Sequence, residues 1–175
     1  MHLKSFATLL KTRRMWVWEI GGAAVYAVPV VIRLVTGNVV LPVLSLVATP
    51  WVGYYIPSNL IEKILVNAFF PGGAGAVAGE IFFSNAKSKI LVGREKYVAR
   101  LYGAFSETAA WSLVQFSGGL LGIAGPWGGN LFEYPSVYPL NFLLASLSIF
   151  TPTVIGFLKN KIADAYHGLK RNGQR

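Results

Sequence analysis

The sequence predicts an all-α integral membrane protein with four transmembrane helices. Charged residues make up only 13% of the chain and hydrophobic residues 54%, whereas a soluble domain carries about 25% charged residues. The mean hydropathy is +0.51, and the apolar residues are gathered in long blocks instead of at amphipathic spacing. We therefore expect one polytopic domain over residues 1–175, embedded in a lipid bilayer.

The first transmembrane helix is expected over residues 15–35. The apolar run MWVWEIGGAAVYAVPVVI follows Arg13 and Arg14 directly, and at a rise of about 1.5 Å per residue it can cross a bilayer core. A cleaved signal peptide is the alternative. The length of the run, the presence of Glu19 and the lack of a clear small-residue cleavage site favour a retained helix.

The second helix is expected over residues 40–62, after a turn at Thr36-Gly37-Asn38. Its apolar block ends at Glu62-Lys63, so the chain returns to the side on which it started. The block contains three prolines, each of which removes a backbone donor. In hydrocarbon such a loss is tolerated only where neighbouring helices, hydroxyl groups or water satisfy the freed carbonyls.

The glycine-rich segment 65–83 has two interpretations. Its sequence, LVNAFFPGGAGAVAGEIFF, is long enough to span, but Pro71 and the glycines beside it interrupt the apolar pattern. A re-entrant or interfacial segment would explain the interruption, because irregular backbone at membrane depth must be shielded by protein or water. The alternative is a helix of small residues that packs closely on its neighbours.

The basic segment 85–100 favours the first interpretation. It carries five basic residues, and basic segments stay on the cytoplasmic side of a membrane. These residues are Lys87, Lys89, Arg94, Lys96 and Arg100. If segment 65–83 crossed the bilayer, they would lie opposite Lys63. The apolar residues between them predict a cytoplasmic amphipathic helix on the membrane surface.

Two further transmembrane helices are expected over residues 101–124 and 140–158. The first is the most polar of the four and contains Glu107 and Gln115, which suggests a buried position. The connection between them, residues 126–139, is rich in Pro, Gly and aromatic residues and contains no Lys or Arg. We expect it to form an outer loop whose aromatic side chains lie at headgroup level.

The distribution of basic residues predicts the orientation. Of the 16 Lys and Arg residues, all but Arg33 fall in the flanks that this topology places in the cytoplasm. Because Lys and Arg concentrate in cytoplasmic loops, we expect a multi-pass protein of the plasma membrane with cytoplasmic N- and C-termini.

The second and fourth apolar blocks share a pattern that suggests two related helical hairpins. Each has a Ser-Leu pair, then Thr-Pro, then Gly followed by an aromatic residue. The matching steps are Ser45-Leu46, Thr49-Pro50 and Gly53-Tyr54 in one block, and Ser146-Leu147, Thr151-Pro152 and Gly156-Phe157 in the other. A parallel repeat would place a substrate path between its halves. Chance is the alternative, because Thr-Pro is a common dipeptide in membrane helices.

Glu19 and Glu107 are the candidate functional residues. An ionisable group inside a membrane helix is costly and by default suggests a functional role. Both lie near a cytoplasmic boundary, so headgroup exposure or pairing with Arg14 or Arg100 is the alternative. Gln115, Thr49 and Thr151 are further candidates for contact with a solute. Each Thr precedes a proline and is positioned to bond to a locally opened carbonyl.

Several function classes find no support in the sequence. The chain has no cysteine, and its two histidines lie near its ends, so we expect no metal site and no cofactor. No nucleophile with a base and no phosphate-binding loop is present, and we expect no enzyme. The net charge of +9 fits headgroup-facing flanks better than nucleic acid.

The layout resembles the small four-helix L-alanine exporter family, in which an acidic residue begins the first and third helices and basic residues follow the second and fourth. The matching positions are Glu19 with Ala23, Ala24 and Tyr26, then Glu107 with Ala109, Ala110 and Gln115, and the Gly53-Tyr54 and Gly156-Phe157 steps. This chain departs from the family in its longer connection 65–100 and in using Glu where the family has Asp. The resemblance implies proton-driven export of a small amino acid.

Two functions remain open at this point. The first is a small transporter or exporter of a small solute, driven by protons through the two glutamates, and a homo-oligomer would be compatible with it. The second is a non-catalytic membrane subunit or scaffold. Its small-residue faces at Gly72-Gly73, Ala76 and Gly118-Gly119 would pack against partner helices.

Overall fold

The computed structural model describes residues 2–36, 60–120 and 137–172, and within these ranges the chain is helical with no strand. The helices are α1 (His2–Leu10), α2 (Arg13–Thr36), α4 (Leu60–Phe69), α5 (Gly72–Lys87), α6 (Gly93–Leu120), α7 (Val137–Ser148) and α8 (Thr151–Asn172). The all-α prediction is confirmed for this part of the chain. Two helical segments, Ile64–Lys87 and Pro139–His167, are long and apolar enough to cross a membrane.

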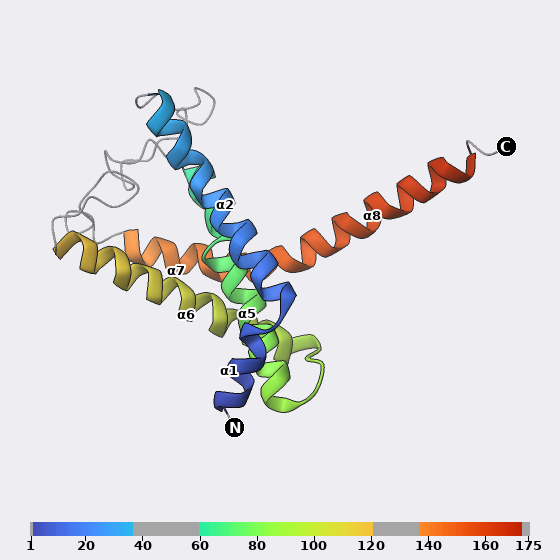
Figure 1. Cartoon of the computed structure of the whole chain (residues 1–175), viewed down its shortest axis with the longest axis horizontal. Helices are drawn as coiled ribbons and strands as arrows, with labels where there is room; N and C mark the ends of the chain where they lie inside the picture. Colours follow the sequence, from blue (N-terminus) through green and yellow to red (C-terminus); the bar gives the residue numbers. More distant parts are fainter. Residues whose placement is uncertain (1, 37–59, 121–136, 173–175) are drawn as a thin grey trace.

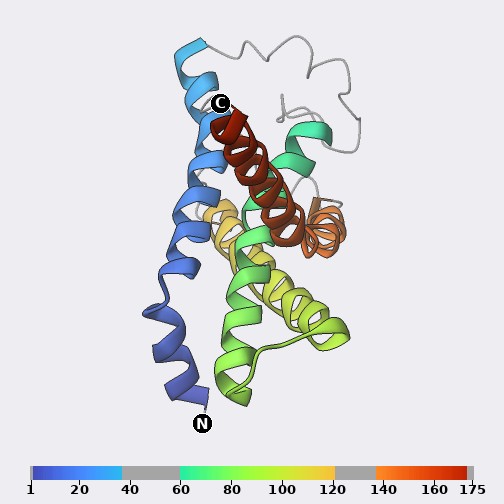
Figure 2. The same cartoon turned by 90° about the vertical axis from the view of Figure 1, so that its right-hand side faces the viewer.

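Helix α5 is the centre of the fold. It contacts α1, α2, α4, α6, α7 and α8, and Figures 1 and 2 show it running beside α2. Its buried residues are mostly small: Gly72, Gly73, Ala74, Gly75, Ala76, Val77, Gly79 and Ile81. Because these side chains occupy little space, the neighbouring helices approach the backbone of α5 closely.

The closest approach is between α5 and α6. A Cβ atom added to Gly79 would lie 2.8 Å from the Cα of Gly103, and one added to Gly75 would lie 2.7 Å from the Gly103 carbonyl oxygen. A second cluster of small residues, Ala76, Ala104 and Ala145, joins α7 to the same surface. Of the two interpretations of segment 65–83, the closely packed small-residue helix describes the observed packing of α5.

A proline break separates α4 from α5. Pro71 has no N–H, so it cannot donate to the carbonyl of Asn67 four residues earlier. The hydroxyl of Ser148 on α7 donates to that carbonyl instead, at 2.9 Å. On the other side, a Cβ added to Gly22 of α2 would lie 2.7 Å from the carbonyl oxygen of Phe69. The break is therefore enclosed by α2 and α7.

The basic segment 85–100 does not form a helix of its own, and this expectation was wrong. Helix α5 continues to Lys87, and a turn follows in which Ser88 has a φ of 52° and Gly93 a φ of +53°. From Gly93 a single helix, α6, runs without a break to Leu120. Its first turns pack on α5 because Ala99 is buried against Gly79.

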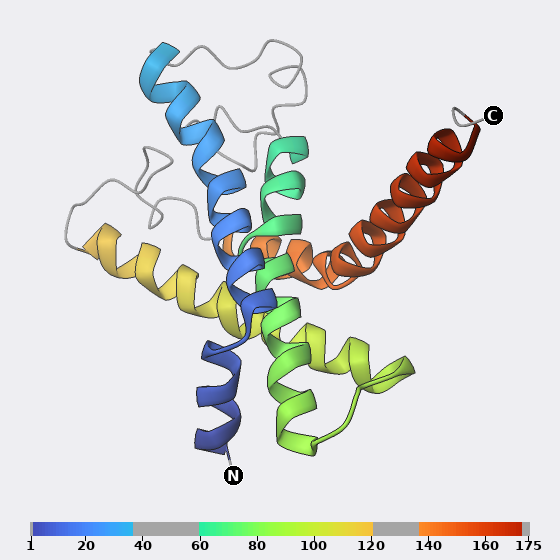
Figure 3. The ribbon, with the colours of Figure 1, turned by 45° about the vertical axis from the view of Figure 1, so that its right-hand side comes forward.

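The expected helix 140–158 is divided in two. Helix α7 ends at Ser148 and α8 begins at Thr151, next to Pro152. Helix α8 then passes through Lys159 and Lys161 to Asn172, although the lysines were expected to end the helix. Lysine is a good helix former, so it ends an apolar segment without ending the helix. Figures 1 and 3 show α8 leaving the body of the molecule.

The remaining predicted elements are the helix 15–35, the helix 40–62 and the outer loop 126–139. Helix α2 covers the residues of the first expected helix, 15–35, and confirms that they are helical. The expected helix 40–62 and the outer loop 126–139 fall almost entirely outside the described residues. Helix α1 was not predicted. Its Leu9 packs with Met15 of α2 and with Val77 and Ile81 of α5.

Candidate functional site

The two predicted glutamates come from different helices and flank α5. Glu107 of α6 lies against the first turn of α5, where a Cβ added to Gly75 would be 2.9 Å from the Glu107 Oε2. Glu19 of α2 follows Trp18, whose ring lies 3.2 Å from a Cβ added to Gly73. Glu107 and the residue next to Glu19 therefore both contact the first turn of α5. The sequence analysis named the two glutamates separately and did not anticipate this shared contact with α5.

Glu107 has an incompletely satisfied carboxylate. Its Oε1 is buried and has no hydrogen-bond partner, and the same is true of the hydroxyl of the neighbouring Thr108, which is only 1% exposed. Buried polar atoms without a partner are rare in proteins, and each costs free energy. The buried Glu107 oxygen can therefore accept a proton or a hydrogen bond.

A second buried polar group lies about one turn further along α5, around Glu80 and Arg100. The side chain of Arg100 is 1% exposed. Its Nε donates to Glu80 Oε2 at 2.6 Å, and its Nη1 donates to the Ile149 carbonyl at 3.0 Å and to the Thr153 hydroxyl at 2.7 Å. This arginine therefore joins α5 and α6 to the junction of α7 and α8.

Glu80 also attracts two further cations. Arg14 of α2 lies 3.4 Å from Glu80 Oε1, and Lys96 of α6 lies 4.0 Å from the same oxygen. Arg14 and Arg100 were considered as partners of Glu19 or Glu107, and both pair with Glu80 instead. Removing one partner of such a buried pair leaves an uncompensated charge, which is strongly unfavourable.

The Glu80–Arg100 pair was missed by the sequence analysis, although a signal was present. Lys96, Arg100, Gly103 and Glu107 are spaced three or four residues apart, so they share one face of a helix. The matching face of α5 carries Glu80 after its glycines. The number of basic residues assigned Arg100 to a cytoplasmic segment on the membrane surface. That count does not indicate on which face of the helix Arg100 lies.

The remaining predicted site residues are Gln115, Thr151 and Thr49. Gln115 lies on α6 about two turns beyond Glu107. Thr151 is half-buried at the start of α8, near the contact between Arg100 and Thr153. Thr49 lies outside the described residues.

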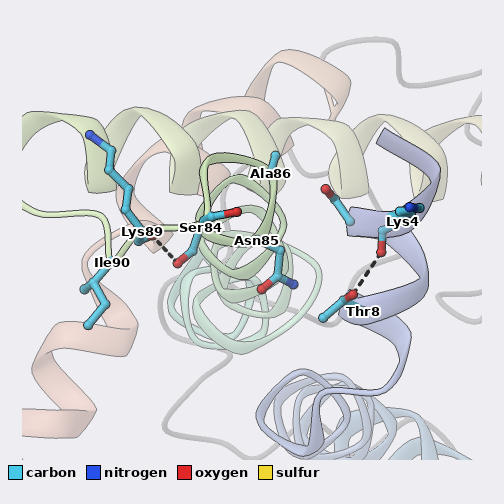
Figure 4. Close-up of a pocket in the computed structure, with 9 residues that line it drawn as sticks. Lys4, Thr8, Ser84, Asn85, Ala86, Lys89 and Ile90 are labelled. Atoms are coloured by element: carbon cyan, nitrogen blue, oxygen red, sulfur yellow. Dashed lines mark hydrogen bonds between the residues drawn. The ribbon is translucent and has the colours of Figure 1, made fainter. Parts of the chain in front are cut away.

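The structure also has a cavity, of about 570 Å³, at the far end of α5 (Figure 4). It lies between α1 and the turn after α5. Its lining residues are Lys4, Ser5, Thr8, Ser84, Asn85, Ala86, Ser88, Lys89 and Ile90. The lining is polar, with Lys4 and Lys89 on opposite sides in Figure 4. The cavity shares no residue with the carboxylate pair.

The described residues contain no group of three or more His, Cys, Asp or Glu side chains that could hold a metal ion. The candidate site thus consists of the two carboxylates Glu19 and Glu107 and the buried Glu80–Arg100 ion pair, contributed by α2, α5 and α6. No protein-family model matches the sequence, and neither the comparison with curated proteins nor that with solved structures finds a match.

Proposed function

We propose that the protein is a small membrane transporter that exports a small solute carrying an ammonium group, such as an amino acid, in exchange for protons. The observation that carries this proposal is that Glu107, with one carboxylate oxygen buried and unpartnered, packs against the glycine-rich first turn of α5, which Trp18, the neighbour of Glu19, also contacts. The proposed topology has four membrane crossings with both termini in the cytoplasm, and it rests on the charge distribution.

The chemistry of Glu19 and Glu107 suits the exchange of a proton for a solute. Two carboxylates whose charges repel each other hold a single proton more readily than two negative charges. A solute ammonium group can replace that proton, because both ligands neutralise the same charge. Proton and solute therefore compete for one site, and this competition couples their movement in opposite directions.

The break between α4 and α5 supports a solute-binding site beside Gly75. Discontinuous helices near the middle of the membrane are the usual setting for solute binding in secondary transporters. Here Pro71 interrupts the helix one turn before Gly75, the residue against which Glu107 packs. The identity of the solute as L-alanine comes from the family resemblance alone and stays a prediction.

Purified protein reconstituted in vesicles tests the proposal. We expect efflux of a labelled neutral amino acid to accelerate when a pH gradient is imposed, and we expect Glu107→Gln to abolish that acceleration. Glu95→Gln is the matched control, because Glu95 is an exposed carboxylate on the same helix, and it should leave transport unchanged. Equal flux with and without the gradient, or full coupling in Glu107→Gln, would contradict the proposal.

A membrane subunit or scaffold is the second candidate, and the exposed length of α8 favours it. The contacts of the small residues that were expected to face partner helices argue against it. Gly72 packs against Ser148, and Ala76 packs against Ala104 and Ala145 of the same chain. Purification in mild detergent separates the two candidates: a stoichiometric second protein would support the subunit, and the chain alone or as a homo-oligomer would support the transporter.

A further inference from the structure

Helix α8 presents a long apolar surface that no other described part of the chain covers. Its first turn is anchored by buried Pro152 and by the hydrogen bond from Arg100 to Thr153. Beyond this turn, the residues with described side chains are almost all exposed, up to 73% for Leu169. The exposed large apolar residues are Val154, Phe157, Leu158, Ile162, Tyr166 and Leu169.

Helical geometry gathers most of these residues into one stripe, whereas Phe157, seven residues before Asp164, lies outside it on the same side as that carboxylate. Successive residues of an α-helix are rotated by about 100°, which places Leu158, Ile162 and Leu169 on one face. Lys159 and Lys161 then fall at the two opposite borders of that face, while Asp164 falls on the far side. The helix thus has an apolar face with a positive charge along each edge.

This arrangement matches a membrane surface. An amphipathic helix that lies in the interface buries its apolar face at the headgroup boundary, and the lysines at its edges extend to the phosphates. The Lys161 ammonium lies 5.7 Å from the centre of the Phe157 ring, one turn earlier along the same border of the stripe. The stripe overlaps the C-terminal part of the apolar segment Pro139–His167, which brings it within reach of a bilayer.

A second copy of α8 fits the same face poorly. Two such helices packed through their stripes would bring the border lysines together on both sides of the contact. Like charges at these flanking positions oppose association. Asp164, on the far side of the helix, cannot offset the repulsion. Charge complementarity therefore selects an anionic lipid surface.

We propose that α8, from Leu158 to Leu169, lies along the cytoplasmic surface of the membrane and binds anionic phospholipid through Lys159 and Lys161. Its direction agrees with this role, because it leaves the body at a steep angle to α2 and α5 (Figures 1 and 3). The inference rests on membrane embedding and is independent of the transport proposal. A loss of transport would not affect it.

The absence of cysteine from the chain permits a direct test with single spin labels. We would place them at Ile162→Cys on the stripe and at Asn160→Cys on the opposite face, in the full-length protein in nanodiscs. We expect the label at position 162 to be accessible to oxygen and shielded from a water-soluble nickel reagent. The label at position 160 should show the reverse.

Two results would overturn the inference. Equal accessibility at the two positions would show a solvated helix, and dipolar broadening between labels at position 162 would show a second copy on the stripe. We also expect the burial of position 162 to be stronger with phosphatidylglycerol than with phosphatidylcholine alone. Lys159→Glu combined with Lys161→Glu should remove this lipid dependence, whereas Lys89→Glu combined with Arg94→Glu, the same charge change outside α8, should preserve it.

Discussion

The two segments that could cross a membrane are covered in opposite ways. In Ile64–Lys87 the most apolar window has a mean hydropathy of 1.3 and is 61% buried within the protein, whereas in Pro139–His167 the window has a mean hydropathy of 1.7 and is only 22% buried. The less apolar segment is thus the more deeply enclosed. Its glycines and alanines let other helices approach, and the large side chains of the second segment face outwards. Hydropathy shows that a segment avoids water, and residue size indicates whether protein or lipid covers it.

The largest expected effect comes from removing the buried charge that fastens the enclosed segment. Arg100→Ala should destabilise the fold by about 3–5 kcal/mol, because it leaves Glu80 buried without its closest partner. Thermal unfolding in mild detergent, followed by far-UV circular dichroism, measures this change. The exposed Lys161→Ala on α8 should change stability by no more than about 0.5 kcal/mol. Similar unfolding midpoints for the two variants would show that Arg100 does not fasten the helices.

A smaller effect is expected from one added methyl group. In Gly103→Ala the new Cβ would lie 2.6 Å from the Cα of Gly79 and against the Gly75 carbonyl, and such overpacking costs about 1–3 kcal/mol. The same change in the exposed helix, Gly156→Ala, meets nothing within 4 Å. It should stabilise α8 by about 0.5–1 kcal/mol, because glycine is a poor helix former. If both variants unfolded at the wild-type temperature, the close α5–α6 contact would be refuted.

The smallest effect is expected at the exposed turn that joins α5 to α6. Hydrogen bonds from Lys89 and Lys87, at 2.8 and 3.2 Å, lower the pKa of Glu95. A carboxyl group with a lowered folded-state pKa adds stability above its unfolded-state pKa, and that contribution is lost as the pH falls through the folded value. Because the group is fully exposed, the loss should be slight and should shrink in high salt.

Unfolding midpoints recorded from about pH 7 to about pH 3 test this small contribution. Glu95→Gln should have a slightly lower midpoint than the wild type at neutral pH, and the difference should vanish at the acidic end. A difference that grew as the pH fell would contradict the sign of the shift.

The sequence predicted which segments are helical better than where each helix begins and ends. Helix α2 was located within a few residues because its apolar run has charged and turn residues at both ends. The end of α8 was misjudged because Lys159 and Lys161 mark the edge of an apolar block and are still good helix formers. The continuity of α6 was missed for a related reason: the charges of Arg94 and Arg100 concealed a face that packs on α5.

The candidate site was predicted in part. Glu19 and Glu107 stand out because carboxylates are rare inside apolar blocks, but their proximity depends on α5 passing between two helices, which one helical pattern cannot specify. The Glu80–Arg100 pair depends on the same packing. Its members are far apart in the chain, and each has an ordinary explanation when read alone.

The hydroxyl of Ser148 has a consequence for motion. It lies 2.9 Å from the Asn67 carbonyl oxygen and 2.7 Å from the Leu144 carbonyl oxygen and shares its one hydrogen between them, so one small side chain links the kinked helix to its neighbour. A rotation of α4 about Pro71 would have to break the hydrogen bond between Ser148 and Asn67, or move α7 as well. Helix α7 leads into the junction that Arg100 joins to α5 and α6. A rotation that begins at Pro71 would therefore move α8 together with α4.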